Sequence, residues 1–252
     1  MKQSRWIVLL ATLVSIGVLS ALGLLAARSG QAEAEQPVVQ MPVFAPTPTI
    51  PAAPGANSSA RGQNVLLNES FSGSQVPGGW RFVDLEEIIA GEEANWTIVD
   101  GALFQDGYGP AQNTSTREIL AITGDPQWAD YTVSVNFYDE DNATFGIVAR
   151  RQGDSFYRFR ATGAPYANED KFVLEKVVDG VSTVVAVEGG TGYAQRVWHT
   201  ATFSLKGAVL TASLDGVVIL EATDNSLRAG EAGLYTRAIG NIRFDDVTIT
   251  AE

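Results

Sequence analysis

Arginine is concentrated in one part of the sequence. Two segments, Thr144–Arg151 and Phe156–Ala161, predict a β-hairpin around residues 152–155, and both carry pairs of arginines: Arg150, Arg151, Arg158 and Arg160. Because side chains alternate between the two faces of a strand, Arg158 and Arg160 are expected on one face, with Tyr157 and Phe159 on the other.

Guanidinium groups are suited to binding oxyanions and hydroxyls, because each presents several donors in one plane. Arg150, Arg158 and Arg160 are therefore candidate ligand-binding residues, and their chemistry fits an acidic glycan. The alternative is structural: the same arginines pair across strands with acids such as Glu175, an arrangement that contributes little stability when it is exposed.

The carboxylates of the sequence do not form a recognisable catalytic set. Glycoside hydrolysis needs two carboxyl groups about 5–10 Å apart. The acidic groups Glu86-Glu87, Glu92-Glu93 and Asp139-Glu140-Asp141 lie in predicted loops, where charged residues are typical of solvated turns. His199, the only histidine, lacks an identifiable partner to orient it as a base and is expected to pack in the fold. No catalytic residue is predicted.

Composition excludes several other classes of function. The 252 residues include no cysteine and one histidine, which excludes a disulfide framework, a thiol nucleophile and sites built from cysteine or several histidines. Asp and Glu number 29 against 17 Lys and Arg, so the formal net charge is −12. Because nucleic-acid binding depends on cations that neutralise phosphates, a nucleic-acid partner is not expected.

Three regions differ in composition. In residues 1–28, the uncharged run Trp6–Ala27 follows Lys2 and Arg5 and is long enough to cross a bilayer core of about 30 Å as a helix. This predicts a single-pass cell-membrane anchor with the C-terminal domain outside. A cleaved signal, which would leave the protein secreted, stays open because Ala32-Glu33-Ala34 is a weak cleavage site.

Residues 29–64 are predicted to be a linker. Six of the ten prolines of the chain fall between Pro37 and Pro54. Proline fixes φ and lacks an N–H, so an extended, semi-rigid stalk is expected.

Residues 65–252 are predicted to be one all-β domain. Their short segments are rich in Val, Ile, Thr, Phe and Tyr, and Tyr131–Phe137 alternates apolar and polar residues as a half-buried strand does. The pairs Asp179-Gly180 and Asp215-Gly216 predict tight hairpin turns. About a dozen such strands without a helical period indicate a two-sheet jelly-roll sandwich.

An ordered set of short motifs across this domain is similar to a known family. The set comprises Trp80, 96–103, 130–135, 146–150, 157–159, 174–176, 198–199, 214–216, 230–234 and 244–247. It resembles the concanavalin A-like lectin/glucanase superfamily, in particular laminin-G-like domains and the domain of 3-keto-disaccharide hydrolases. The resemblance implies two curved antiparallel sheets that bind glycans or protein partners, frequently with calcium. The paired carboxylates of laminarinase-type glycosidases, Glu-x-Asp-x-Glu, are not present.

The sequence predicts a metal site formed by the two ends of the domain. Residues 68–71 and 244–247 resemble the first and last strands of laminarinase-type jelly rolls, which hold a structural Ca2+. Glu69 and Asp245 are the matching positions, with Asp246 as a substitute. Oxygen ligands suit calcium, and a shared ion would join the ends of a domain that has no disulfide. The alternative is a set of acids at exposed strand ends.

These observations favour an extracytoplasmic, membrane-tethered binding module without catalysis, for carbohydrate or a cell-surface protein. The alternative is a carbohydrate-active hydrolase of the 3-keto-disaccharide type. A third possibility is an accessory ectodomain that binds no sugar and mediates assembly.

Overall fold

The computed structural model describes residues 50–54, 64–86, 93–106, 117–141, 143–164, 170–237 and 241–252. The predicted anchor, 1–28, and most of the predicted linker, 29–64, lie outside these ranges. Within them the chain forms strands and no helix, and therefore no helix there could cross a membrane. Ile50–Glu252 form one compact unit.

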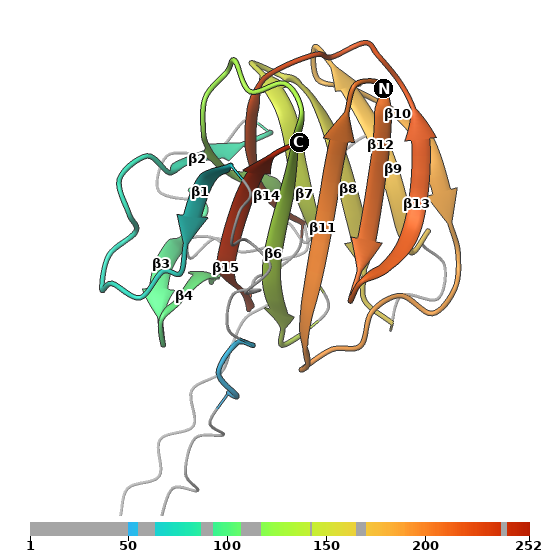
Figure 1. Ribbon diagram of the computed structural model, residues 1–252. Coiled ribbons are helices and arrows are strands. Elements are labelled where there is room, and N and C mark those ends of the chain that lie inside the picture. The colour runs from blue at the N-terminus through green and yellow to red at the C-terminus, as the bar shows by residue number, and fades with distance from the viewer. Residues whose placement is uncertain are drawn as a thin grey trace, which may run out of the picture. The chain divides into compact units, whose positions relative to one another are not determined.

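Two antiparallel sheets face each other (Figure 1). The eight-stranded sheet contains both ends of the domain, because β1 pairs with β15 at its side. Its strands, in spatial order, are β13 (Val217–Thr223), β12 (Val209–Leu214), β11 (Trp198–Lys206), β6 (Tyr131–Asp139), β15 (Ile242–Ala251), β4 (Ala102–Gln105) and β3 (Trp96–Val99), with β1 (Val65–Glu69) beside β15.

The seven-stranded sheet carries the arginine hairpin at its centre. Its strands, in spatial order, are β10 (Val181–Glu188), β9 (Phe172–Val178), β8 (Ser155–Thr162), β7 (Thr144–Gln152), β14 (Glu231–Arg237), β5 (Glu118–Thr123) and β2 (Arg81–Asp84). The predicted all-β, two-sheet sandwich is confirmed. Strand β2 was not among the strands that the sequence predicted.

The core lies between the sheets and follows the predicted alternation. Along β11, His199, Ala201, Phe203 and Leu205 are buried, whereas the residues between them are partly exposed. Aromatic rings fill the centre; those of Phe137 and Phe145, from opposite sheets, stack with centroids 4.0 Å apart. Large aromatic side chains provide much of the apolar burial of the sandwich.

The two predicted hairpin turns adopt the expected conformation. Asp179 and Gly180 have φ of 49° and 78°, and Asp215 and Gly216 have 50° and 79°. Two successive residues with positive φ are typical of a type I′ turn, whose twist matches that of the flanking strands.

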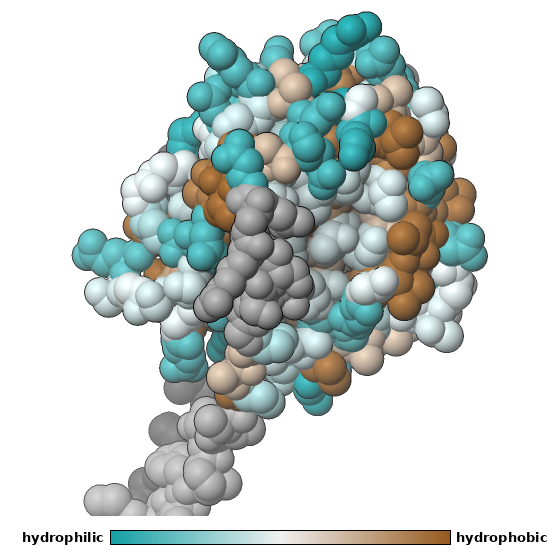
Figure 2. Space-filling view, viewed as in Figure 1, coloured by the Kyte–Doolittle hydropathy of each residue, from teal (hydrophilic) through white to brown (hydrophobic). Residues whose placement is uncertain are grey.

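One side of the sandwich has apolar residues on its surface. The edge strands β10 and β13 lie close to each other there, and both expose valines: Val181, Val184, Val187, Val217 and Val218. Figure 2 shows apolar surface on the side where β13 lies in Figure 1.

Candidate functional site

Arg158 lies at the centre of a charged ladder on the outer face of the seven-stranded sheet. Its Nη1 lies 3.0 Å from Glu118 Oε2, and its Nη2 lies 2.7 Å from Glu175 Oε2. Arg160 contacts the same Glu175 oxygen through Nε at 3.2 Å. As predicted, Tyr157 and Phe159 point to the opposite face, into the core. The structure thus shows cross-strand pairing of the arginines, and their role in ligand binding stays a prediction.

Burial strengthens the electrostatic coupling within this ladder. Arg158 is 3% exposed, and its guanidinium lies 4.2 Å from the centre of the Tyr235 ring. Burial by itself raises the pKa of Glu118, but the Arg158 charge and the Tyr235 hydroxyl, which donates to Glu118 at 2.7 Å, lower it below its usual value overall. Glu118 is therefore held as a carboxylate.

Apolar side chains surround the ladder on the same face. Leu120, Ile122, Val148, Phe156, Val177 and Tyr235 form a second buried cluster, separate from the main core. Val148 is the register partner of Arg158, which places the apolar cluster and the ladder side by side. The ladder is thus embedded in apolar surroundings, where unpaired charges are costly.

Arg150 does not join Arg158 and Arg160. Backbone φ at Arg150 is 49°, at a bulge in β7. Its guanidinium binds the carbonyls of Ala129, Leu227 and Gly207 at 2.7 to 3.0 Å and Asp130 Oδ1 at 2.9 Å. Four of its five N–H groups are thereby engaged, and the residue is 1% exposed. Arg150 holds loops of the sandwich together at its rim, where a bulge has turned it away from the ladder.

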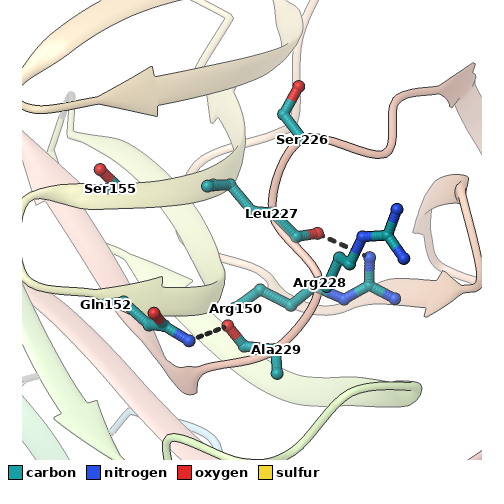
Figure 3. A pocket seen from close by; sticks show the side chains of 7 residues that line it. All are labelled: Arg150, Gln152, Ser155, Ser226, Leu227, Arg228 and Ala229. Carbon is teal, nitrogen blue, oxygen red and sulfur yellow. Dashed lines mark hydrogen bonds between the residues drawn. The ribbon is translucent and has the colours of Figure 1, made fainter.

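A cavity of about 430 Å³ opens beside Arg150 (Figure 3). It is lined by residues of the β7–β8 hairpin and of the loop between β13 and β14: Arg150, Gln152, Ser155, Ser226, Leu227, Arg228 and Ala229. We call it the rim pocket. Gln152 Nε2 donates to the Ala229 carbonyl at 3.0 Å, which ties the two segments together.

Arg228 is the free cation of the rim pocket. It is exposed and has no hydrogen bond or ion pair with the residues that the structure describes. A smaller hollow of about 160 Å³, lined by Asp130, Arg150, Gly207 and Asn225, shares Arg228 with the rim pocket. The sequence contained no signal for Arg228, because a single arginine in a polar turn looks like any solvated loop residue.

Asp224 fixes the loop that carries Arg228. It accepts hydrogen bonds from Tyr157 Oη at 2.5 Å, Lys176 Nζ at 2.7 Å and Ser226 N at 2.8 Å. Burial opposes ionisation of Asp224, but the bonds from Lys176 and Tyr157 lower its pKa well below the usual range. The loop backbone is thus held in place while the Arg228 side chain remains available.

The three predicted metal ligands lie on two paired strands, β1 and β15. Glu69 lies opposite Val247 where β1 pairs with β15, and Asp246 Oδ2 accepts a hydrogen bond from Asn136 Nδ2 at 3.1 Å. Burial, followed by the charges of Asp246 and Glu69, raises the pKa of Asp245 to about 6. Carboxylate oxygens are the type of ligand that a hard cation prefers. Among the described residues no three His, Cys, Asp or Glu side chains form a metal-binding group, and calcium stays a prediction.

His199 and Asp139 have structural partners. His199 Nδ1 lies 2.7 Å from Asp215 Oδ2, and its Nε2 lies 2.8 Å from the Ala194 carbonyl. Asp139, expected in a solvated turn, is instead buried at the end of β6, where Tyr193 Oη donates to it at 2.9 Å. Burial raises the pKa of Asp139. Both residues are engaged in holding loops to the sandwich.

Solved structures share this fold at low identity. A carbohydrate-binding module of family 66 from Bacillus subtilis is 16% identical, with a TM-score of 0.52, over 69% of this chain and 96% of that one. A Bacillus subtilis protein of galectin-like fold is 12% identical (TM-score 0.55; 75% and 96% covered), and a Bacillus licheniformis β-glucanase is 11% identical (TM-score 0.53; 76% and 99% covered). These likenesses show a lectin- and glucanase-like jelly-roll sandwich.

Sequence comparison gives a more specific relationship. Galactocerebrosidase of Danio rerio is 33% identical over 141 residues, which are 53% of this chain and 21% of that enzyme. The chain thus corresponds to about a fifth of the enzyme's length. The family model described as "Galactocerebrosidase, C-terminal lectin domain" matches residues 111–252, more than half of the chain. The chain therefore belongs to the family of galactocerebrosidase C-terminal lectin domains.

Proposed function

We propose that this chain is a non-catalytic carbohydrate-binding module, and that it binds its ligand in the rim pocket. The observation that carries the proposal is the free guanidinium of Arg228 beside a cavity of about 430 Å³. Membership of a lectin-domain family supports a carbohydrate ligand. Ligand sites combine apolar surface with a few placed polar groups, and the rim pocket offers both.

The lining of the rim pocket suits a sugar ring. Leu227 and Ala229 offer apolar surface to the C–H groups of the ring, while Arg228 and Gln152 offer planar polar groups to its hydroxyls or carboxylate. Arg150 retains one N–H group, and its other bonds hold it rigidly at the pocket wall. Rigid polar groups bind at a lower entropic cost than mobile ones.

A glycan array followed by calorimetric titration of the best ligand tests this proposal. Arg228→Ala is expected to weaken binding by at least about tenfold, since it removes a charge-assisted contact. Arg196→Ala is the control, because Arg196 is an exposed arginine two residues before β11, whereas the pocket lies beyond the other end of that strand; Arg196 Nε donates to the Glu140 carbonyl at 3.1 Å, away from the pocket. Wild-type affinity in Arg228→Ala would remove the rim pocket from consideration.

Arg158 and Arg160, in the charged ladder, remain candidate ligand-binding residues of a second site. The Arg160 side chain is 16% exposed and is the more accessible member of the ladder. Arg160→Ala in the same titration separates the two sites. A loss of affinity with Arg160→Ala and none with Arg228→Ala would move the glycan to the ladder.

The alternative is a hydrolase of the 3-keto-disaccharide type. Glu118 and Glu175, the carboxylates that the ladder brings together, are both neutralised by Arg158. A general acid needs a raised pKa, whereas that of Glu118 is lowered. We therefore do not expect Glu118 and Glu175 to act as a general acid and its partner in the turnover of 3-keto-disaccharides. Turnover that disappears in Glu118→Gln would establish the hydrolase and overturn the non-catalytic proposal.

Tethering to the cell membrane is part of the proposal. The uncharged run Trp6–Ala27, with Lys2 and Arg5 before it, supports an anchor that leaves the sandwich outside the cell, where carbohydrate or a cell-surface protein would be its partner. Extraction of membranes at alkaline pH, with mass analysis of the N-terminus, tests this. We expect the intact chain in the membrane fraction; a shortened chain in the medium would indicate a cleaved signal and a secreted protein.

A further inference from the structure

Residues 50–54 lie against the outer face of the eight-stranded sheet. Trp198 Nε1 donates to the Pro51 carbonyl at 2.7 Å, and Asn136 Nδ2 donates to the Pro54 carbonyl at 2.7 Å. The short blue segment near the lower ends of β6 and β15 in Figure 1 is this stretch. The contacts are made by side chains of β11 and β6, and no described strand pairs with the segment.

The spacing of these two bonds has a structural meaning. A polyproline II helix has three residues per turn, so carbonyls of residues three apart point to the same side. Pro51 and Pro54 are three apart, and each fixes its own φ near the polyproline value. Their backbone carbonyls have no partner within such a helix. Side-chain donors can therefore recognise this conformation by its carbonyls.

The groove under the segment is equipped for such recognition. Trp198 contacts the Tyr138 ring, with centroids 5.4 Å apart, and this pair provides an aromatic surface. Asn136 is held in place, because its Oδ1 accepts from Thr200 Oγ1 at 2.7 Å and its Nδ2 also donates to Asp246. A cavity of about 340 Å³ lies between the segment and the sheet. Aromatic grooves with a fixed donor are the usual binding sites for proline-rich peptides.

We propose that the Trp198–Asn136 groove is a recognition site for a short proline-containing peptide, and that residues 50–54 of the same chain occupy it. The proposal is independent of the carbohydrate site, which lies at the other end of β11. Its consequence is that the domain holds residues 50–54 of its own proline-rich linker.

Binding of a peptide from solution tests the proposal. The probe is a fluorescent peptide with the sequence of residues 48–56, and fluorescence polarisation measures its binding to the full-length chain. Pro51→Gly with Pro54→Gly removes the preorganised conformation of the resident segment and is expected to open the groove. The matched control, Pro42→Gly with Pro46→Gly, changes the same linker outside residues 50–54.

The peptide should bind the Pro51→Gly, Pro54→Gly chain at least about tenfold more tightly than it binds the native chain or the control, whose groove is filled. Adding Trp198→Phe, which keeps the ring and removes the N–H donor, should weaken this binding by about fivefold or more. A peptide in which both prolines are glycine should bind less well. Equal binding to all chains, or none to the opened one, would overturn the proposal, as would binding unaffected by Trp198→Phe.

Discussion

Arg158 separates two carboxylates on the outer face of the seven-stranded sheet. Removing its side chain would leave Glu118 without its ion-pair partner and the buried Glu175 with Arg160 as its one remaining ion-pair partner among the described residues. Breaking a buried ion pair by removing one partner costs about 3–5 kcal/mol. Arg158→Ala should therefore lower the free energy of unfolding by that amount in urea denaturation. Arg160→Ala, whose residue makes one contact in the ladder, should cost about 1 kcal/mol or less; equal losses would contradict this assignment.

Ionisation of Glu118, in the same charged ladder, should make the stability of the protein depend on pH. Its pKa is lower in the folded protein than in the unfolded chain, so the unfolded chain binds more protons at mildly acidic pH. The stability that ionised Glu118 contributes is thus complete above its pKa in the unfolded chain, which is about 4.3. It is lost as the pH falls through the lower pKa of the folded protein. Glu118→Gln should be about 1–3 kcal/mol less stable than wild type at pH 7. This difference in stability between wild type and variant should become smaller towards pH 3 in thermal melts. A difference that does not depend on pH would argue against stabilisation by the Glu118 charge.

At the scale of elements, β14 is constrained by its place between β5 and β7. A Cβ on Gly233 would lie 2.5 Å from the Ala121 carbonyl oxygen and from Ile122 Cδ1. Gly233→Ala should destabilise the protein by about 1–3 kcal/mol, because the neighbouring backbone cannot move without breaking the hydrogen bonds between β5 and β14. Gly78→Ala is the control, since a Cβ there meets nothing within 4 Å, and its effect should stay within about 0.5 kcal/mol. A neutral Gly233→Ala would show that β5 and β14 pack more loosely.

Elements were predictable where their signal is local. The Asp-Gly turns predicted two hairpins, because adjacent positive φ angles are set by the two residues themselves. The placement of Arg158 and Arg160 on one face, opposite Tyr157 and Phe159, also followed from the period of one strand. Arg150 did not follow, because the bulge that turns it depends on the pairing of β7 with its neighbours.

At the scale of the whole molecule, the two ends of the domain meet. Glu69 lies on β1, and Asp245 and Asp246 lie on the paired strand β15; we propose that they bind calcium with help from backbone carbonyls. Calcium at 100 times its Kd would stabilise the fold by about 2.7 kcal/mol. The melting temperature should rise with calcium and fall with chelator. Asp245→Asn with Asp246→Asn should abolish this response, and an unchanged midpoint in the wild type would exclude the site.

The sequence by itself determined the class of the domain: alternating short strands, Asp-Gly turns and the lack of cysteine require a β-sandwich held by its core. It also placed Arg158 and Arg160 on one face of their strand. Only the tertiary structure decided which groups meet. Arg158 meets Glu118 from 40 residues away, Trp198 meets Pro51, and Arg228 remains free at the rim pocket. These contacts depend on sheet order, register and bulges, which arise from pairing between distant strands and leave no local pattern.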